Sequence, residues 1–297
     1  MKALVTGATG FIGSHLARRL IELNWNVHVL KRETSSLLRL EGCVDSLQLH
    51  DLDGIDFESL WRTIGKVDVV FHLATAYGRD GQSDEQVHQT NVLIPGQLLT
   101  QAGEFAPLCI AADTCFPVTY PYLQAYTGSK KQFASWGKQW AAETGSRFVN
   151  LVLQHPFGPS DGEGKFVPWL IGQCLGNVDA IDLTTGLQKK DFIYVADVVD
   201  AMVAIAEQQD ELPSQFSELP CGRGDATTVR SFVERIHEVS QSSSKLNFGA
   251  VPDREGEPPE SYADTTAINA LGWTPRTSLD DGIRLTVDWH RKNRTLC

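Results

Sequence analysis

Tyr126 and Lys130 are the residues whose types and spacing best suit chemistry in this chain of 297 residues. They form a Tyr-x-x-x-Lys segment in a helical pattern, Ala125–Glu143, which places both side chains on one face of the helix. A protonated lysine favours the phenolate of a nearby tyrosine, whereas burial disfavours it. Such a tyrosine can give a proton to a developing alkoxide or take one from an alcohol. The motif also arises by chance, as a pair on the surface.

A glycine triplet near the start of the chain is the second chemical element. Gly7, Gly10 and Gly13 lie between an apolar run, Lys2–Thr6, that predicts a buried strand and a helical pattern of leucines. A strand, a glycine turn and a helix N-terminus form an anion site, because backbone N–H groups and the helix dipole point at a phosphate. An ordinary strand-to-helix turn is the alternative. Together with the Tyr–Lys pair, the triplet predicts a dinucleotide and hydride transfer between it and a carbonyl or alcohol.

The residues after the second predicted strand, Asn26–Leu30, indicate which dinucleotide fits. An acidic residue there would bind a ribose 2′-hydroxyl group, and a basic residue would accept a 2′-phosphate. Lys31 and Arg32 follow the strand, then a glutamate and two hydroxyl side chains. Two cations and two hydroxyl groups suit a phosphate. We therefore expect NADP(H) rather than NAD(H), with a solvated charged turn as the alternative.

Composition excludes several classes of protein. Hydrophobic residues make up 42% of the chain, which supports a substantial core, and the net charge of −11 argues against nucleic acid as a partner. The six cysteines lack Cys-x-x-Cys spacing, so we expect free thiols in a reducing compartment and no metal site. No apolar run approaches the length of a membrane span. Because the first strand begins at Lys2, we expect no signal peptide and a cytoplasmic protein.

Alternating strand and helix patterns through about residue 155 predict an α/β fold, a parallel sheet with helices on both faces. The expected strands are Lys2–Thr6, Asn26–Leu30, Val44–His50, Val67–His72, Pro107–Ala112 and Phe148–Leu153. The expected helices between them are Phe57–Ile64, Asp84–Glu104, which Pro95 should kink or break, and Ala125–Glu143. The later part should hold a polar linker, Glu211–Pro220, a short strand, Asp191–Val195, and the helices Phe166–Leu175, Ala196–Gln208, Thr228–Ser240 and Asp281–Arg291.

These residues resemble the extended short-chain dehydrogenase/reductase superfamily, in its branch of nucleotide-sugar epimerases, dehydratases and reductases. The matching motifs span nearly the whole chain: Thr6–Gly13, His72–Ala76, Tyr126–Lys130, Phe157–Pro159, Lys190–Val195, Tyr262–Asp264 and Leu271–Pro275. Within the branch, the chain is similar to reductases of 4-keto-6-deoxyhexoses, of the CDP-abequose synthase and dTDP-fucose synthase type. The resemblance implies a Rossmann-type doubly wound parallel sheet over residues 1–155 and about 190–208. It also implies a smaller, discontinuous C-terminal substrate lobe over residues 156–189 and 209–297.

The resemblance also implies roles for individual residues. Tyr126 would donate the proton, and Lys130 would bind the nicotinamide ribose and tune Tyr126. The cofactor would be bound at its pyrophosphate, its 2′-phosphate, its adenine and its nicotinamide. The residues that would bind it are Gly7, Gly10, Phe11, Ile12, Gly13, Lys31, Arg32, Asp51, Leu52, Leu73, Ala74, Thr75, Tyr126, Lys130 and His155. The substrate would be bound by Thr114, His155, Lys165, Lys190 and Arg254.

The chain departs from the family pattern at several of these positions. Ala112 stands where the family has a serine or threonine, and an alanine side chain cannot hydrogen-bond. Thr114 carries the nearest hydroxyl group, and we expect it to replace that serine or threonine. The alternative is that Thr114 merely caps a loop. Of the Asp–Glu pair of 4,6-dehydratases, Asp113 is present but Thr114 stands in place of the glutamate, which argues against a dehydratase. His155 stands where the branch often has an asparagine, and a purely structural histidine is the alternative to a role in binding. Lys190 stands where the family usually has an arginine, and a surface cation is the alternative there.

The sequence thus predicts NADPH-dependent reduction of the 4-keto group of a nucleotide-diphosphate-linked 4-keto-6-deoxyhexose. A nucleotide-sugar 4-epimerase with a retained NAD is the main alternative. A reductase of a small aldehyde or ketone, and a cofactor-binding sensor without catalysis, are further ones. The resemblance also implies a homodimer, formed through the helices Asp84–Glu104 and Ala125–Glu143.

Overall fold

The structure is a computed structural model that describes residues 1–79, 81–119 and 123–293. The chain forms two compact units. The first consists of Met1–Leu153, Val199–Pro220 and Ala267–Trp273, and the second of Gln154–Val198, Cys221–Thr266 and Thr274–Cys297. The boundaries differ from the expected ones: residues 209–220 belong with the first unit, because they lead into a strand of its sheet, and residues 190–198 belong with the second.

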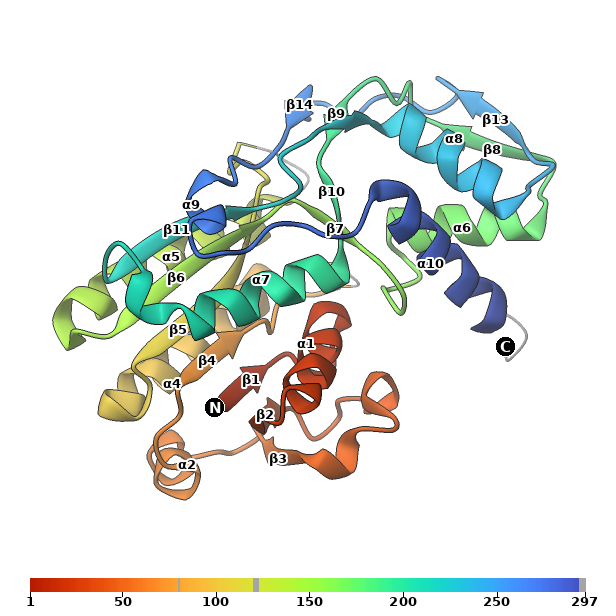
Figure 1. Cartoon of the computed structure of the whole chain (residues 1–297). Coiled ribbons are helices and arrows are strands. Elements are labelled where there is room, and N and C mark those ends of the chain that lie inside the picture. Colours follow the sequence, from red (N-terminus) through yellow and green to blue (C-terminus); the bar gives the residue numbers. More distant parts are fainter. Residues whose placement is uncertain (80, 120–122, 294–297) are drawn as a thin grey trace. The chain divides into compact units, whose positions relative to one another are not determined.

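A seven-stranded parallel sheet forms the centre of the first unit, in the order β11-β6-β5-β4-β1-β2-β3 (Figure 1). The strands are β1 (Lys2–Thr6), β2 (Asn26–Lys31), β3 (Leu47–Asp51), β4 (Val69–His72), β5 (Leu108–Thr114), β6 (Arg147–Leu153) and β11 (Phe216–Cys221). The strand order reverses between β1 and β4. Ligands of such sheets bind outside the carboxyl ends of the strands at this switch point. The expected α/β class is confirmed.

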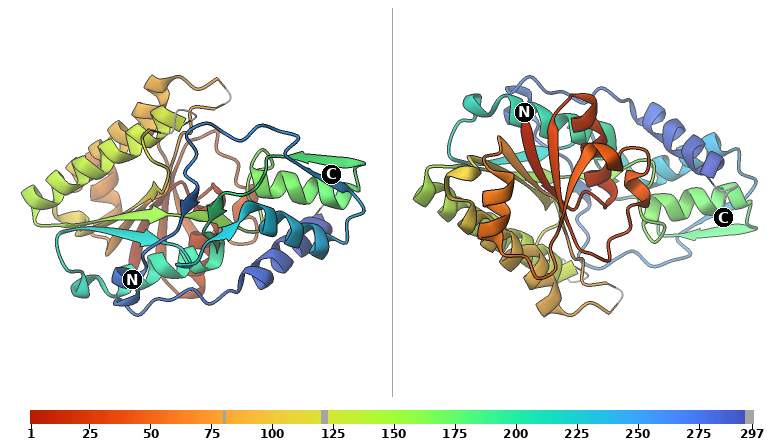
Figure 2. Two further views of the ribbon diagram at one scale, coloured as in Figure 1. Left: turned by 90° about the horizontal axis from the view of Figure 1, so that it is seen from above. Right: turned by 90° about the horizontal axis from the view of Figure 1, so that it is seen from below.

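Helices cover both faces of the sheet (Figures 1 and 2). On one face, α2 (Phe57–Ile64), α4 (Ile94–Ala102) and α5 (Gln124–Thr144) share an aromatic core with β6. On the other face, α1 (Phe11–Glu22) and α7 (Val195–Glu207) are joined by an Arg19–Asp200 ion pair of 3.1 Å. The core residues of β1 and β4 are fully buried, as continuous apolar strands of a parallel sheet must be.

Three expected elements take a different form. The helix expected over 84–104 divides into α3 (Asp84–His88), a π-helical turn (Gln89–Leu93) and α4. Pro95 lies in the first turn of α4, where its missing N–H group does no harm, so the predicted break is confirmed. The third strand begins at Leu47, because residues 44–46 form a 3₁₀ turn. The polar linker expected at 211–220 is wrong, because Phe216–Cys221 is the edge strand β11.

The second unit combines small sheets with three main helices. Strand β7 (His155–Phe157) pairs with β10 (Phe192–Tyr194), and β8 (Ala180–Leu183) pairs with β13 (Lys245–Phe248). Strand β9 (Lys189–Lys190) lies between β12 (Thr227–Thr228) and β14 (Glu260–Ser261). The helices are α6 (Phe166–Gly176), α8 (Val229–Ser240) and α10 (Leu279–Asn293), whereas the short α9 (Thr266–Asn269) belongs to the first unit from Ala267 onward. Phe192 and Phe232 stack at 3.7 Å in the core of the second unit. Among the described residues, no helix is long and apolar enough to cross a membrane.

Candidate active site

The glycine loop packs so closely that side chains are excluded from it. Gly7 has a φ of +74°, and a Cβ atom there would lie 2.4 Å from the backbone nitrogen of Ala74. A Cβ atom at Gly13 would lie 2.1 Å from the carbonyl oxygen of Gly7. Helix α1 follows directly, with Gly10 at its N-cap and no side chain capping it. Its first backbone N–H groups therefore remain available to an anion, so the loop fits the pyrophosphate of a dinucleotide.

The ends of β2 and β3 bring together the residues expected at the 2′-phosphate and the adenine. Lys31 and Asp51 are register partners, and their side chains form an ion pair. Arg32 is exposed. The backbone N–H group of Leu52 donates to the carbonyl oxygen of Lys31 at 2.7 Å. Of the two expected cations, Lys31 is thus ion-paired with a carboxylate, and Arg32 faces solvent.

Arg39 is a cation that the sequence analysis missed. Its Nη1 atom lies 3.5 Å from the carbonyl oxygen of Thr9 in the glycine loop. Arg18 of α1 holds this segment by donating to the backbone oxygens of Arg39 and Glu41, each at 2.8 Å. Arg39 therefore adds positive charge beside the loop. The signal in the sequence is the same as for Lys31, because Arg39 is also a basic residue after the second predicted strand.

The residues after β4 that are expected to line the cofactor are tied to the helix of the Tyr–Lys pair. Asn91 donates to the carbonyl oxygen of Ala76 at 2.8 Å and to the hydroxyl group of Ser129 at 2.9 Å, and it accepts from the N–H group of Ala76 at 2.8 Å. Leu73, Ala74 and Thr75 are thereby held between the glycine loop and α5.

Lys130 is buried, and its ammonium group is directed by two oxygen atoms. Nζ donates to the hydroxyl group of Thr75 and to the carbonyl oxygen of Ala112, both at 2.9 Å. Burial lowers the pKa of Lys130 to about 8, and the nearby charge of Asp113 opposes this shift. Ala112 lacks the expected hydroxyl group, but its backbone oxygen contributes to the site.

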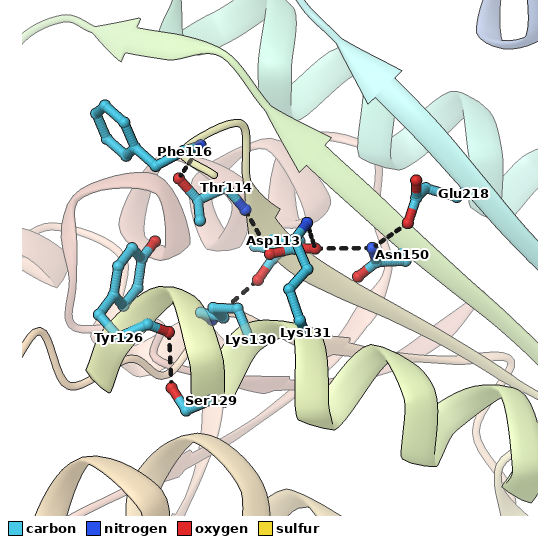
Figure 3. A network of polar contacts seen from close by, with 10 residues as sticks. Asp113, Thr114, Phe116, Tyr126, Ser129, Lys130, Lys131, Asn150 and Glu218 are labelled. Atoms are coloured by element: carbon cyan, nitrogen blue, oxygen red, sulfur yellow. Dashed lines mark hydrogen bonds and ion pairs between the residues drawn. The ribbon is translucent and has the colours of Figure 1, made fainter. Parts of the chain in front are cut away.

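Tyr126 lies on α5 with its ring buried and its hydroxyl group toward Thr114 (Figure 3). Burial raises the pKa of Tyr126 well above its usual value. Tyr77, whose ring centroid lies 4.9 Å away, adds to this effect, and a hydrogen bond with the Thr114 side chain opposes it. Of the two opposing influences considered for this tyrosine, burial therefore prevails, and the phenol is held protonated. The arrangement can donate a proton to an oxygen atom placed beside it.

Thr114 caps a turn and also contacts Tyr126, while its expected role in holding the substrate oxygen stays a prediction. It ends β5, and its Oγ1 atom accepts a hydrogen bond of 3.3 Å from the N–H group of Phe116, as a residue that caps a turn does. The same hydroxyl group bonds with Tyr126. The structure thus brings Tyr126, Lys130 and Thr114 together at the carboxyl end of β5 (Figure 3).

The expected substrate residues of the second unit form a smaller group. Lys190 is only 3% exposed, and Nζ lies 3.2 Å from a carboxylate oxygen of Glu257, so it is not a surface cation. Burial, with the charge of Lys190, lowers the pKa of His155 to about 3, so the imidazole is neutral. Lys165 forms an ion pair of 3.2 Å with Asp161 at the start of α6, and Arg254 is exposed. The described residues hold no cluster suited to a metal ion.

Comparison with known proteins gives several matches. A sequence model of the NAD dependent epimerase/dehydratase family matches residues 3–217. CDP-abequose synthase of Salmonella muenchen is 32% identical over 292 residues, which cover 95% of this chain and 96% of that protein. GDP-L-fucose synthase 1 of Arabidopsis thaliana is 33% identical over 314 residues, covering 98% and 94%. The solved structure of UDP-glucose 4-epimerase from Thermotoga maritima with UDP-glucose is 24% identical. It has a TM-score of 0.85 and covers 99% of this chain and 100% of that chain, a likeness that shows the fold alone.

Proposed function

The chain belongs to the NAD-dependent epimerase/dehydratase family, and we propose that it reduces the 4-keto group of a nucleotide-diphosphate-linked 4-keto-6-deoxyhexose with NADPH. The first unit would bind the dinucleotide and the second the nucleotide sugar. The observation that supports this best is the buried Tyr126, whose hydroxyl group bonds with Thr114 and which lies on the same helix as the buried Lys130. A relative named CDP-abequose synthase supports the same class of reaction.

The proton step follows from these three side chains. When bound, the nicotinamide supplies the hydride that adds to the keto carbon. The oxygen of the former carbonyl then gains negative charge and takes the proton of the Tyr126 hydroxyl group. Thr114 orients that oxygen by hydrogen bonding, and the ammonium group of Lys130 stabilises the phenolate that remains.

Residues expected to bind the nucleotide sugar support the substrate class. Lys190 is a buried cation that forms an ion pair with Glu257. Arg254 is an exposed cation in the segment before Glu257. Cations of this kind suit a diphosphate. Thr114 in place of a glutamate leaves the site without the second acid that an elimination of water requires, so we favour a reductase over a dehydratase.

The choice of NADPH rests on positive charge around the glycine loop. Lys31 ends β2, Arg32 follows it, and Arg39 lies beside Thr9. The Lys31–Asp51 ion pair offers a second possibility, because a carboxylate at this place suits a free 2′-hydroxyl group. This pair is the specific observation that favours the second candidate function, a nucleotide-sugar 4-epimerase that retains NAD.

Purified protein with CDP- or dTDP-4-keto-6-deoxyglucose and NADPH tests the proposal, with NADH as the control. Consumption of NADPH with either sugar is the expected result. Tyr126→Phe should abolish turnover while NADPH still binds, and an unchanged rate would refute the role of Tyr126. An inert protein that purifies with bound NAD and interconverts nucleotide sugars at C4 would instead identify the epimerase.

A further inference from the structure

A cluster of charged and polar side chains, centred on one buried carboxylate, lies next to Thr114. At its centre is the carboxylate of Asp113, which is 1% exposed. One oxygen accepts a hydrogen bond of 2.7 Å from the backbone N–H group of Thr114. The other accepts from Nδ2 of Asn150 at 2.8 Å and from Nζ of Lys131 at 2.7 Å (Figure 3). Both oxygens of this carboxylate therefore have hydrogen-bond partners, as a buried charge requires.

The cluster connects four elements of the first unit. Asp113 is on β5, Lys131 on α5 and Asn150 on β6, and Asn150 also donates to Glu218 of β11 at 3.0 Å. Buried ion pairs contribute little to stability on balance, because desolvation opposes the attraction between the charges. A role for Asp113 is therefore best sought in the groups next to it.

Two of those neighbours are the groups proposed to act in the reaction. The hydrogen bond to the N–H group of Thr114 fixes the peptide that carries the hydroxyl group toward Tyr126. The negative charge of Asp113 also raises the pKa of Lys130 and of Tyr126, which favours the protonated form of each. One carboxylate thus affects both the geometry and the protonation of the site.

We propose that Asp113, held by Lys131 and Asn150, is a positioning residue of the reaction. It fixes Thr114 against Tyr126 and keeps Lys130 in its ammonium form. This inference rests on the proposed reduction, in which Tyr126 and Lys130 both act in their protonated forms. A proton-donating site loses activity as the pH rises through the pKa of the group that deprotonates first, and in this structure that group is Lys130.

The other ionisable groups facing Lys130 do not take over this task. Tyr126 lies on the same helix and is neutral. His72 on β4 is neutral as well, because burial and the charge of Lys130 lower its pKa to about 3. Lys131 is bound to Asp113 and adds a like charge, which would lower the pKa of Lys130. Among the described residues that act on Lys130, Asp113 supplies the negative charge.

Two substitutions with opposite electrostatic effects test the proposal. Asp113→Asn keeps the shape of the side chain but removes its charge. The alkaline limb of the kcat profile should move to lower pH by on the order of one unit, with kcat at pH 7 reduced about two-fold and KM little changed. Lys131→Met removes the neighbouring cation and one contact that anchors Asp113. We therefore expect kcat to fall several-fold and the limb to move to higher pH.

A purely structural cluster would behave differently, because both variants would then lower kcat and leave the limb unmoved. An unmoved limb in Asp113→Asn, or a shift in the same direction in Lys131→Met, overturns the proposal. If Asp113→Asn does not fold, as judged by circular dichroism, Lys131→Met decides alone: reduced kcat with the limb moved to higher pH supports the proposal, and an unmoved limb contradicts it.

The pH dependence of NADPH binding separates this inference from the proposed function. Lys130 is expected to hold the nicotinamide ribose, so Kd should rise above about pH 8 in the wild type and at lower pH in Asp113→Asn. This titration needs no substrate. If the wild type binds NADPH but reduces no 4-keto sugar, the proposed function fails, and the Kd profiles of the two proteins still decide the role of Asp113.

Discussion

Gly13→Ala gives the sharpest test of the dinucleotide site, because the clash it creates can be read from the structure. The added Cβ atom would lie 2.1 Å from the carbonyl oxygen of Gly7, 2.7 Å from its carbonyl carbon and 2.8 Å from Cα of Ala8. Ordinary contact begins at 3.4 Å. All three neighbours are backbone atoms and cannot rotate away, so the loop itself must move by about 1 Å.

Such a movement misaligns the N–H groups at the start of α1 with the phosphates. A hydrogen bond to a charged group contributes about 1.5–3 kcal/mol, so the loss of one or two should raise the Kd for NADPH on the order of 100-fold. Fluorescence titration of NADPH measures this directly. Gly10→Ala is the matched control, because its Cβ atom would lie 3.2 Å from the oxygen of Gly7, a contact that small adjustments relieve.

We expect Gly10→Ala to bind NADPH within about ten-fold of the wild type. Both variants should retain the far-ultraviolet circular dichroism of the native protein, since the sheet lies below the loop. A folded Gly13→Ala protein with wild-type affinity, or equal losses in the two variants, would refute the reasoning that this loop closes on the pyrophosphate.

Three further substitutions test packing and cofactor choice. Gly137→Ala should destabilise the protein by about 1–3 kcal/mol in urea unfolding, because its Cβ atom would lie 2.4 Å from the ring of Phe148. Gly128→Ala, with no atom within 4 Å, should stabilise the same helix by about 1 kcal/mol; equal effects would contradict the packing of α5. Asp51→Asn should release Lys31 and improve NADPH binding over NADH about two- to five-fold. An unchanged Kd ratio would show that Lys31 does not meet the 2′-phosphate.

The sequence predicted those parts of the fold that depend on local pattern. The Tyr–Lys spacing fixed both residues on one helix face, and the glycine triplet lies between β1 and α1 as expected. Pro95 broke its helix because a proline acts on its own turn. Phe216–Cys221 was missed because its run contains serine, glutamate and proline, and only pairing with β6 identifies it as a strand.

Features that depend on tertiary contacts were beyond sequence reasoning. The Lys31–Asp51 ion pair requires the register of β2 with β3. Arg39 approaches the glycine loop because Arg18 holds its segment. The sequence analysis considered Asp113 only as half of a dehydratase pair, since nothing in the order of residues indicates that Asn150 lies beside it.

Burial of the junction between α5 and β5 also bears on the direction of the chemistry. Reductases and epimerases share the Tyr–Lys motif, so the motif alone does not separate them. An epimerase begins by taking a proton from an alcohol and therefore needs a phenolate, whereas a reductase needs a phenol. In this chain burial raises the pKa of Tyr126 well above its usual value, while burial lowers the pKa of Lys130, on the same helix, to about 8. Tyr126 is therefore a phenol, the form from which a reductase starts, but a weaker acid than an exposed tyrosine. Transfer of its proton to a developing alkoxide thus depends on the hydroxyl group of Thr114 and the ammonium group of Lys130, which stabilise the phenolate.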